Sequence, residues 1–285
     1  QSVMQRNDDN AAFTREVGHP LTLAINAFGQ GGYDECVRLI RDIRAIPRGR
    51  FALNDVSPFE DLDYTKELLT AMIPLGKTWG GLATTRIVDD PEVMELLRKS
   101  GCRFLLIGFE SSQQRTLNTI HKGFNRGANY DEVMRRLHAA GIVVQGCFVL
   151  GFDNDGPDCF RRTVDEVQRL KIDIPRFSLY TPYPGTESFE EGAKLGLYPA
   201  DCWDKLMKDP LCGVKVPVCW EQYLTRDELL DMLKICHRKF YFRPRFIARQ
   251  IRHLQSGAEF KRLFDAAMSL VKLELTPTNA HESPV

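Results

Sequence analysis

Short apolar runs alternate with amphipathic stretches along most of this chain, and that alternation limits its fold more than any other feature. The apolar runs predict strands at 21–27, 50–54, 79–84, 104–109, 143–150 and 177–180. Stretches with helical periodicity lie between them, at 33–46, 61–75, 91–100, 113–120, 130–140 and 158–170. Strands that alternate with helices in this way form βαβ units. We therefore predict an α/β fold with a parallel sheet.

Local signals define the ends of several helices. Asp90 offers an N-cap carboxylate before Pro91, and Gly101 stands where the same helix should end. Thr225 and the glutamate three residues later, Glu228, form a capping box at the start of a helix predicted at 225–242. A further helix is predicted at 258–273.

Polar residues follow five consecutive predicted strands. In a parallel α/β fold all strands end on the same rim, where such proteins bind their ligands. A single polar residue after a strand is usually part of a turn. Five such strand ends in succession predict a polar ligand site on the rim. The residues are Asn54 and Asp55, then Thr84, Thr85 and Arg86, then Glu110 and Ser111, then Asp153, then Thr181 and Tyr183.

Charge and composition exclude several classes of protein. The formal net charge is zero, so nothing in the overall charge attracts nucleic acid or a membrane. No apolar run approaches the length of about 18 residues that a transmembrane helix needs. None of the eight cysteines forms a C-x-x-C pair. We therefore predict reduced thiols, no metal-ligating residues and a cytoplasmic location.

Residues 33–265 resemble radical S-adenosylmethionine (SAM) enzymes, particularly the type that often has a cobalamin-binding domain upstream. The order and spacing of short stretches carry this resemblance, at 51–55, 79–90, 96–102, 107–112, 117–122, 140–153 and 181–186. It implies a partial (β/α)6 barrel of the TIM type over residues 33–186. An atypical segment, 1–32, would precede the barrel, and a mostly helical C-terminal extension, 187–285, would follow it.

The resemblance also implies contacts with SAM for individual residues. Asn54 and Asp55 would lie near its amino group, and Glu110 and Ser111 near its ribose or amino-acid part. Lys122 would meet its carboxylate, Gly151 and Asp153 its adenine, and Arg86 belongs to the same cofactor-binding set. Structural alternatives stay open for most of them. Asn54, Asp55 and Ser111 could instead cap helices. Lys122 could be a solvated charge, and Gly151 could mark a strand bulge.

One expected motif is absent from the sequence. The family holds a [4Fe–4S] cluster with C-x-x-x-C-x-x-C after its first strand, whereas here the loop at 28–32 has no cysteine and Cys36 stands alone. The chain also begins with Gln. We therefore expect either a fragment that is inactive alone or a cluster-free relative, with cobalamin held by a domain outside this chain.

Two functions follow from these observations. The first is the core of a radical SAM enzyme, which cleaves SAM to a 5′-deoxyadenosyl radical or transfers a methyl group with the help of cobalamin. The second is a non-catalytic barrel that binds SAM, another nucleoside or a partner protein. A small-molecule substrate and no nucleic acid are expected. The basic segment 234–262 allows a weak contact with a membrane surface, or is a solvated helix face. No residue pattern identifies the substrate, a catalytic residue or the oligomeric state.

Overall fold

The computed structural model describes residues 50–53, 59–120, 122–125, 129–152, 156–209 and 218–252, together with 261, 265 and 268. The strand predicted at 21–27, the helix predicted at 33–46 and most of the helix predicted at 258–273 lie outside the described residues. Asn54, Asp55 and Asp153 lie outside them as well.

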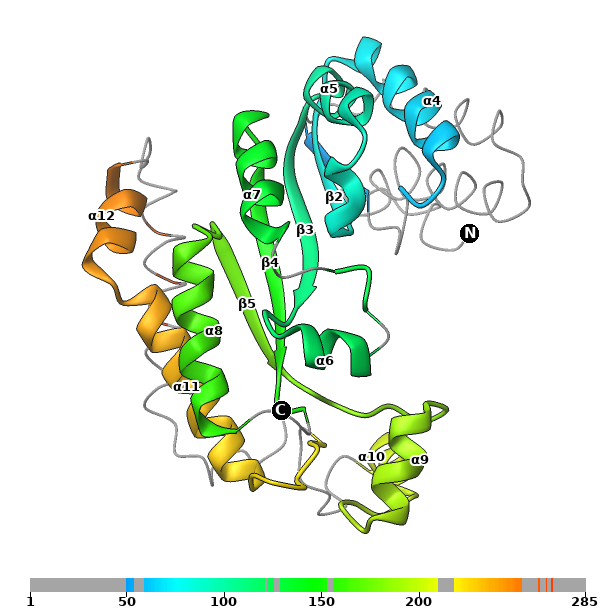
Figure 1. Cartoon of the computed structure of the whole chain (residues 1–285), viewed down its shortest axis with the longest axis vertical. Helices are drawn as coiled ribbons and strands as arrows, with labels where there is room; N and C mark the ends of the chain where they lie inside the picture. Colours follow the sequence, from blue (N-terminus) through cyan, green and yellow to red (C-terminus); the bar gives the residue numbers. More distant parts are fainter. Residues whose placement is uncertain are drawn as a thin grey trace, which may run out of the picture. The chain divides into compact units, whose positions relative to one another are not determined.

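Five parallel strands form one sheet in sequential order, β1-β2-β3-β4-β5 (Figure 1). The register pairs Phe51 of β1 with Trp79 of β2, and Leu82 of β2 with Leu106 of β3. The α/β fold with a parallel sheet is thus confirmed. The strands are β1 (Arg50–Leu53), β2 (Thr78–Ala83), β3 (Cys102–Glu110), β4 (Val143–Leu150) and β5 (Ile174–Leu179).

The helices between these strands lie within a few residues of their predicted bounds. They are α4 (Leu62–Met72) with a 3-10 turn η4 (Ile73–Leu75), α5 (Pro91–Ser100), α6 (Gln114–Thr119), α7 (Tyr130–Ala139) and α8 (Pro157–Arg169). The sequence did not predict the 3-10 turn η5 (Thr85–Val88) after β2. Beyond β5 come α9 (Glu187–Lys194), α10 (Cys202–Lys208), α11 (Arg226–Tyr241) and α12 (Pro244–Arg252).

The chain divides into two compact units. Among the described residues, the first unit takes up those to Phe109, together with 124–147 and 172–175. The second unit takes up 110–123, 148–171 and the residues from Arg176 onward.

In the first unit, helices α4 and α5 pack side by side (Figure 1). Asp90 is the N-cap of α5, as predicted, and its carboxylate accepts hydrogen bonds from the backbone N–H groups of Glu92 (2.7 Å) and Val93 (3.1 Å). Lys66 of α4 also pairs with Asp90, at 2.9 Å. Gly101 ends α5 with a left-handed φ of 90°, so both predicted helix ends are confirmed.

In the second unit, helices α8 and α11 pack side by side (Figure 1). The predicted capping box at the start of α11 is present, with Thr225 as N-cap and Glu228 as its partner. The buried Cys236 thiol of α11 donates to the Phe160 carbonyl of α8 at 3.5 Å. A small core that includes Phe189, Tyr198, Cys202 and Val218 forms around α9 and α10.

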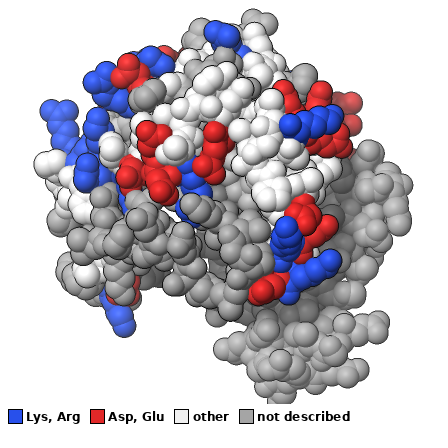
Figure 2. All heavy atoms as spheres, turned by 90° about the horizontal axis from the view of Figure 1, so that it is seen from below, with Lys and Arg blue, Asp and Glu red and all other residues white. Residues whose placement is uncertain are grey.

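Side chains of both charge signs lie next to each other on the face that Figure 2 shows. The described residues also include ion pairs along single helices, such as Arg98 with Glu95 at 2.7 Å and Arg169 with Glu166 at 2.7 Å. Among the described residues, no helix has the length and apolar character needed to cross a membrane.

Candidate functional site

The second unit contains a pocket of about 590 Å³ where three strands end. We call it the strand-end pocket. Glu110 closes β3, Phe152 follows β4, and Tyr180 follows β5. Because parallel strands end on the same edge, side chains from distant parts of the sequence meet there. The lining residues are Glu110, Thr119, Ile120, Lys122, Val149, Phe152, Tyr180, Glu187, Ser188, Glu191 and Trp220.

Glu110 has an unusual backbone and an unusual environment. Its φ is 64°, in the left-handed region that costs a residue with a side chain about 1–2 kcal/mol. The side chain is half-buried, and this burial raises the pKa of its carboxyl above the ordinary value. The positive charge of Lys122 acts in the opposite direction on the same pKa. Two residues of the predicted set therefore interact within one pocket.

Side chains of the first unit fix the two carbonyl groups that precede Glu110 in the chain. The buried Asn125 amide donates to the carbonyls of Gly108 (2.9 Å) and Phe109 (3.4 Å). The buried Tyr130 hydroxyl also donates to Phe109, at 2.7 Å. These bonds hold the end of β3 in one conformation before the chain turns at Glu110.

Three aromatic rings form one wall of the strand-end pocket. Phe152 and Tyr180 have ring centroids 4.6 Å apart, and Tyr180 and Trp220 have centroids 6.0 Å apart. The Tyr180 backbone N–H donates to the Leu150 carbonyl at 2.8 Å, which fixes β5 against the end of β4. The Trp220 indole N–H donates to the Gln222 side chain at 3.2 Å. Such a wall suits a planar, apolar group of a ligand.

Helix α9 supplies the carboxylates of the pocket other than Glu110. Its N-cap is Thr186, whose hydroxyl accepts from the Phe189 N–H at 3.2 Å. Glu187 and Glu191 lie one helical turn apart on α9, so both side chains are on the side of the helix that lines the pocket. Behind them, Gly192 packs so closely that a Cβ atom there would overlap the Tyr198 hydroxyl oxygen.

Ser111 and Gly151 have local structural roles. The Ser111 hydroxyl accepts from the Gln113 N–H at 3.0 Å, in the turn just before α6, but the N-cap of α6 is Gln113 and not Ser111. Gly151 has a φ of 90° directly after β4, and an added Cβ would lie 3.1 Å from Leu229. Neither residue lines the strand-end pocket. Their predicted contact with SAM stays a prediction.

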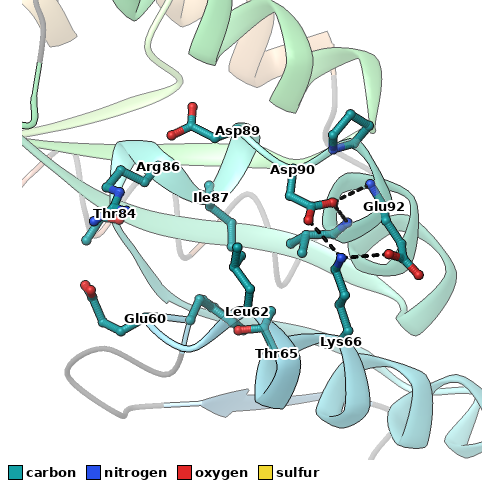
Figure 3. Close-up of a pocket in the computed structure, with 13 residues that line it drawn as sticks. Glu60, Leu62, Thr65, Lys66, Thr84, Arg86, Ile87, Asp89, Asp90 and Glu92 are labelled. Carbon is teal, nitrogen blue, oxygen red and sulfur yellow. Dashed lines mark hydrogen bonds and ion pairs between the residues drawn. The ribbon is translucent and has the colours of Figure 1, made fainter.

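Arg86 lies in the first unit, in a second pocket of about 590 Å³ beyond the end of β2. Figure 3 shows Arg86 close to Thr84 at one side of this pocket, with Leu62 and Ile87 between it and the ion pairs of Lys66. Asn54, Asp55 and Asp153, outside the described residues, cannot be assigned to either pocket.

Most residues of the pocket's lining carry no recognisable signal in the sequence. Aromatic residues at strand ends, such as Phe152 and Tyr180, look like ordinary core residues. Trp220 and Glu191 lie beyond the barrel strands, in a stretch without clear periodicity. A usable signal was present only for Phe152, which directly follows the predicted site residue Gly151.

The described cysteines do not form a site for an iron–sulfur cluster. Burial raises the pKa of the Cys102, Cys219 and Cys236 thiols, in each case to about 12. Cluster ligation needs thiolates, which such burial disfavours. Among the residues that the structure describes, no three His, Cys, Asp or Glu side chains are grouped so that they could hold a metal ion.

Two relatives show what this chain is similar to in sequence. It is 43% identical over 128 residues to bacteriochlorophyllide d C-12(1)-methyltransferase of Chlorobaculum tepidum, a match that covers 45% of this chain and 28% of that protein. It is 26% identical over 203 residues to the anaerobic magnesium-protoporphyrin IX monomethyl ester cyclase of Cereibacter sphaeroides, covering 68% of this chain and 31% of that enzyme. The chain thus spans about a third of the length of these relatives. No protein-family model matches it.

A solved structure shows the same fold. It is the radical SAM methyltransferase TsrM of Kitasatospora setae, determined with cobalamin and a [4Fe–4S] cluster bound. The TM-score is 0.51 at 18% sequence identity, over 56% of this chain and 34% of that one. With relatives that are methyltransferases and cyclases, and with this fold, the predicted resemblance of the chain to the radical SAM superfamily is confirmed.

Proposed function

We propose that this chain is the SAM-binding core of a radical SAM enzyme and that SAM occupies the strand-end pocket. One observation carries the proposal. Glu110 and Lys122, which the resemblance assigns to SAM, line the same pocket as the aromatic wall of Phe152, Tyr180 and Trp220. The pocket thus combines a carboxylate, an ammonium group and a flat apolar surface, three features that suit a charged nucleoside.

Each side chain then has a specific role. The Lys122 ammonium is a flexible point charge suited to the carboxylate of SAM. The Glu110 carboxylate accepts hydrogen bonds from its ribose hydroxyls or its ammonium group. The aromatic wall contacts the adenine ring. Glu187 and Glu191 leave the pocket with an excess of negative charge, which favours a ligand that carries a sulfonium and an ammonium group.

The wider architecture is part of the proposal. We propose a partial (β/α)6 barrel over 33–186, and the fold of TsrM supports an α/β fold of this kind. Asn54, Asp55, Arg86 and Asp153 are proposed as further SAM-binding residues, as the resemblance implies. Residues 1–32 would form the atypical segment, and 187–285 the mostly helical extension.

The reaction is proposed from the relatives. In a complete enzyme of this type, a [4Fe–4S] cluster supplies the electron that cleaves SAM, and cobalamin carries a methyl group. If cobalamin takes part here, we propose that a domain outside this chain holds it. Because both relatives act on tetrapyrroles, methylation or cyclisation of a tetrapyrrole is the first reaction to test.

Titration of the purified chain with SAM, followed by ligand-observed NMR, tests the pocket. Without a cluster to anchor the methionine end we expect a dissociation constant near 1 mM, about −4 kcal/mol. Glu110→Ala should weaken binding by about 1–3 kcal/mol, the cost of a lost charge-assisted hydrogen bond. Glu190→Gln is the control, because Glu190 lies on α9 without lining the pocket. Equal loss in both variants, or in neither, would remove Glu110 from the site.

The second candidate is a non-catalytic module that binds SAM or another nucleoside without cleaving it. The absence of C-x-x-x-C-x-x-C from the sequence favours it. Iron and sulfide analysis after anaerobic reconstitution separates the two functions. Stoichiometric iron and sulfide, with the visible absorbance of a cluster, would support the enzyme, whereas SAM binding without either would support the module.

A further inference from the structure

Basic and apolar side chains are exposed around the corner between α11 and α12, in the second unit. Residues 232–258 contain no Asp or Glu. We call this group of exposed residues the basic corner. Its members are Ile235, Arg238, Lys239, Phe242, Arg245 and Ile247.

Helix geometry places three of these residues together. Ile235, Arg238 and Lys239 are spaced three and four residues apart along α11, so they share its outer face, and Phe242 is the C-cap residue at the end of this helix. The opposite face is the buried one and carries Cys236 and Phe240. The outer face is therefore not used in packing against α8.

The apolar side chains of the basic corner are well exposed. Ile235, Phe242 and Ile247 keep 37%, 39% and 43% of their surface accessible. Lys239 and Arg245 are exposed as well, and within the described part of the chain neither forms an ion pair. The basic corner thus combines exposed positive charge with exposed apolar area.

A nearby arginine and two aromatic rings connect the helices at the corner. The Arg243 guanidinium donates to the Phe240 carbonyl at 2.8 Å and lies 4.0 Å from the centre of the Phe240 ring. Phe240 in turn packs edge-on against Phe246 of α12, with ring centroids 5.4 Å apart. These contacts join the end of α11 to the start of α12.

We propose that the basic corner docks on the surface of an anionic phospholipid bilayer. Charge complementarity selects the partner, because anionic headgroups attract each nearby Lys or Arg by about 1 kcal/mol. The exposed Phe242 and the two isoleucines favour a lipid surface over nucleic acid, since they can enter the boundary between headgroups and acyl chains. A second copy of the chain is disfavoured, because it would bring the same positive charges together. This proposal is independent of the SAM site.

Vesicle sedimentation of the whole chain tests the proposal. The protein should bind vesicles of phosphatidylcholine with phosphatidylserine, bind far less to phosphatidylcholine alone, and dissociate in high salt. The double variant Lys239→Gln and Arg245→Gln should weaken binding about thirtyfold, from two lost charges at about 1 kcal/mol each. Phe242→Ser should weaken binding as well.

The matched control is Lys194→Gln with Lys208→Gln, which removes two exposed positive charges elsewhere in the second unit. It should change binding less than twofold, and circular dichroism should show that all variants fold. Equal binding to neutral vesicles, or an equal loss in the control, would overturn the proposal. So would no binding to any vesicle, the result expected if residues after 252 cover the corner. Competition by DNA that Phe242→Ser leaves unchanged would assign the corner to nucleic acid instead.

Discussion

Among the described residues, two that are not glycine have a left-handed backbone, Glu110 with φ 64° and Lys171 with φ 57°. Lys171 follows the end of α8 and is exposed, whereas Glu110 lines the strand-end pocket. Replacing either residue with glycine relieves the same kind of backbone strain. Only the replacement of Glu110 also changes the strand-end pocket. The pair therefore separates a backbone effect from a binding effect.

The magnitudes follow from the two environments. Glycine removes a left-handed penalty of about 1–2 kcal/mol and costs about 0.5–1 kcal/mol in chain entropy. Lys171→Gly should therefore stabilise the fold by up to about 1.5 kcal/mol. Glu110→Gly also loses about 0.8 kcal/mol from two half-buried methylene groups. Burial raises the pKa of the Glu110 carboxyl, which means that burial disfavours its charged form. Removing this carboxyl therefore favours the folded state at neutral pH, and the net gain in stability should be similar to that of Lys171→Gly.

Urea unfolding followed by circular dichroism gives the change in stability, and ligand-observed NMR gives the affinity for SAM. We expect neither variant to be less stable than the parent, and only Glu110→Gly to lose SAM. A loss of more than about 1 kcal/mol of stability in Glu110→Gly, with SAM binding intact, would show that Glu110 serves packing rather than binding.

Two further predictions concern the same pocket. Gly192→Ala should destabilise the second unit by about 1–3 kcal/mol, because the new methyl group would overlap the Tyr198 hydroxyl and lie 2.9 Å from Trp220. Thermal unfolding measures this loss. The control is Gly123→Ala, where the nearest atom is 3.4 Å away and no comparable loss of stability is expected. Because the pKa of Glu110 is raised in the folded state, the unfolded chain loses this proton at a lower pH than the folded chain does. The contribution of Glu110 to stability therefore falls as the pH rises from the ordinary glutamate pKa near 4.5 through the raised pKa. Unfolding measured across that range should show a smaller fall for Glu110→Gln than for the parent, and an identical fall would contradict the assignment.

The sequence predicted the parallel sheet and the helices between its strands because each of those elements has its own periodicity. Caps add to this signal in some of them, as in helix α5, where Asp90 and Gly101 define both ends. Helix α9 has an N-cap, Thr186, but α9 and α10 are too short for a clear periodicity. They are eight and seven residues long, and they bury few side chains of their own, such as Phe189 and Cys202. Their core forms only when Tyr198 and Val218 join it, which no local pattern reveals.

The sequence predicted only part of the polar lining, Glu110 and Lys122, and not Glu187 or Glu191. The rule that strands end on one rim predicted Glu110 as a site residue, and Glu110 lines the strand-end pocket. It could not identify Tyr180 and Trp220, because a ring that will face a ligand has the same sequence appearance as a ring in the core. Their position in one wall follows from tertiary packing between β5 and a later segment.

The stability of the fold does not explain why residue 110 is a glutamate and not a glycine. The chain needs a left-handed residue where β3 ends, and at the corresponding place after β4 it uses Gly151, with φ 90°. Glycine at position 110 would meet the same need without the strain of a side chain and without a half-buried carboxyl. The bonds from Asn125 and Tyr130 engage the carbonyls before residue 110 and would accept glycine there equally well. What glycine would lack is the carboxylate in the strand-end pocket, so the cost at this position is best explained by a ligand that the carboxylate binds.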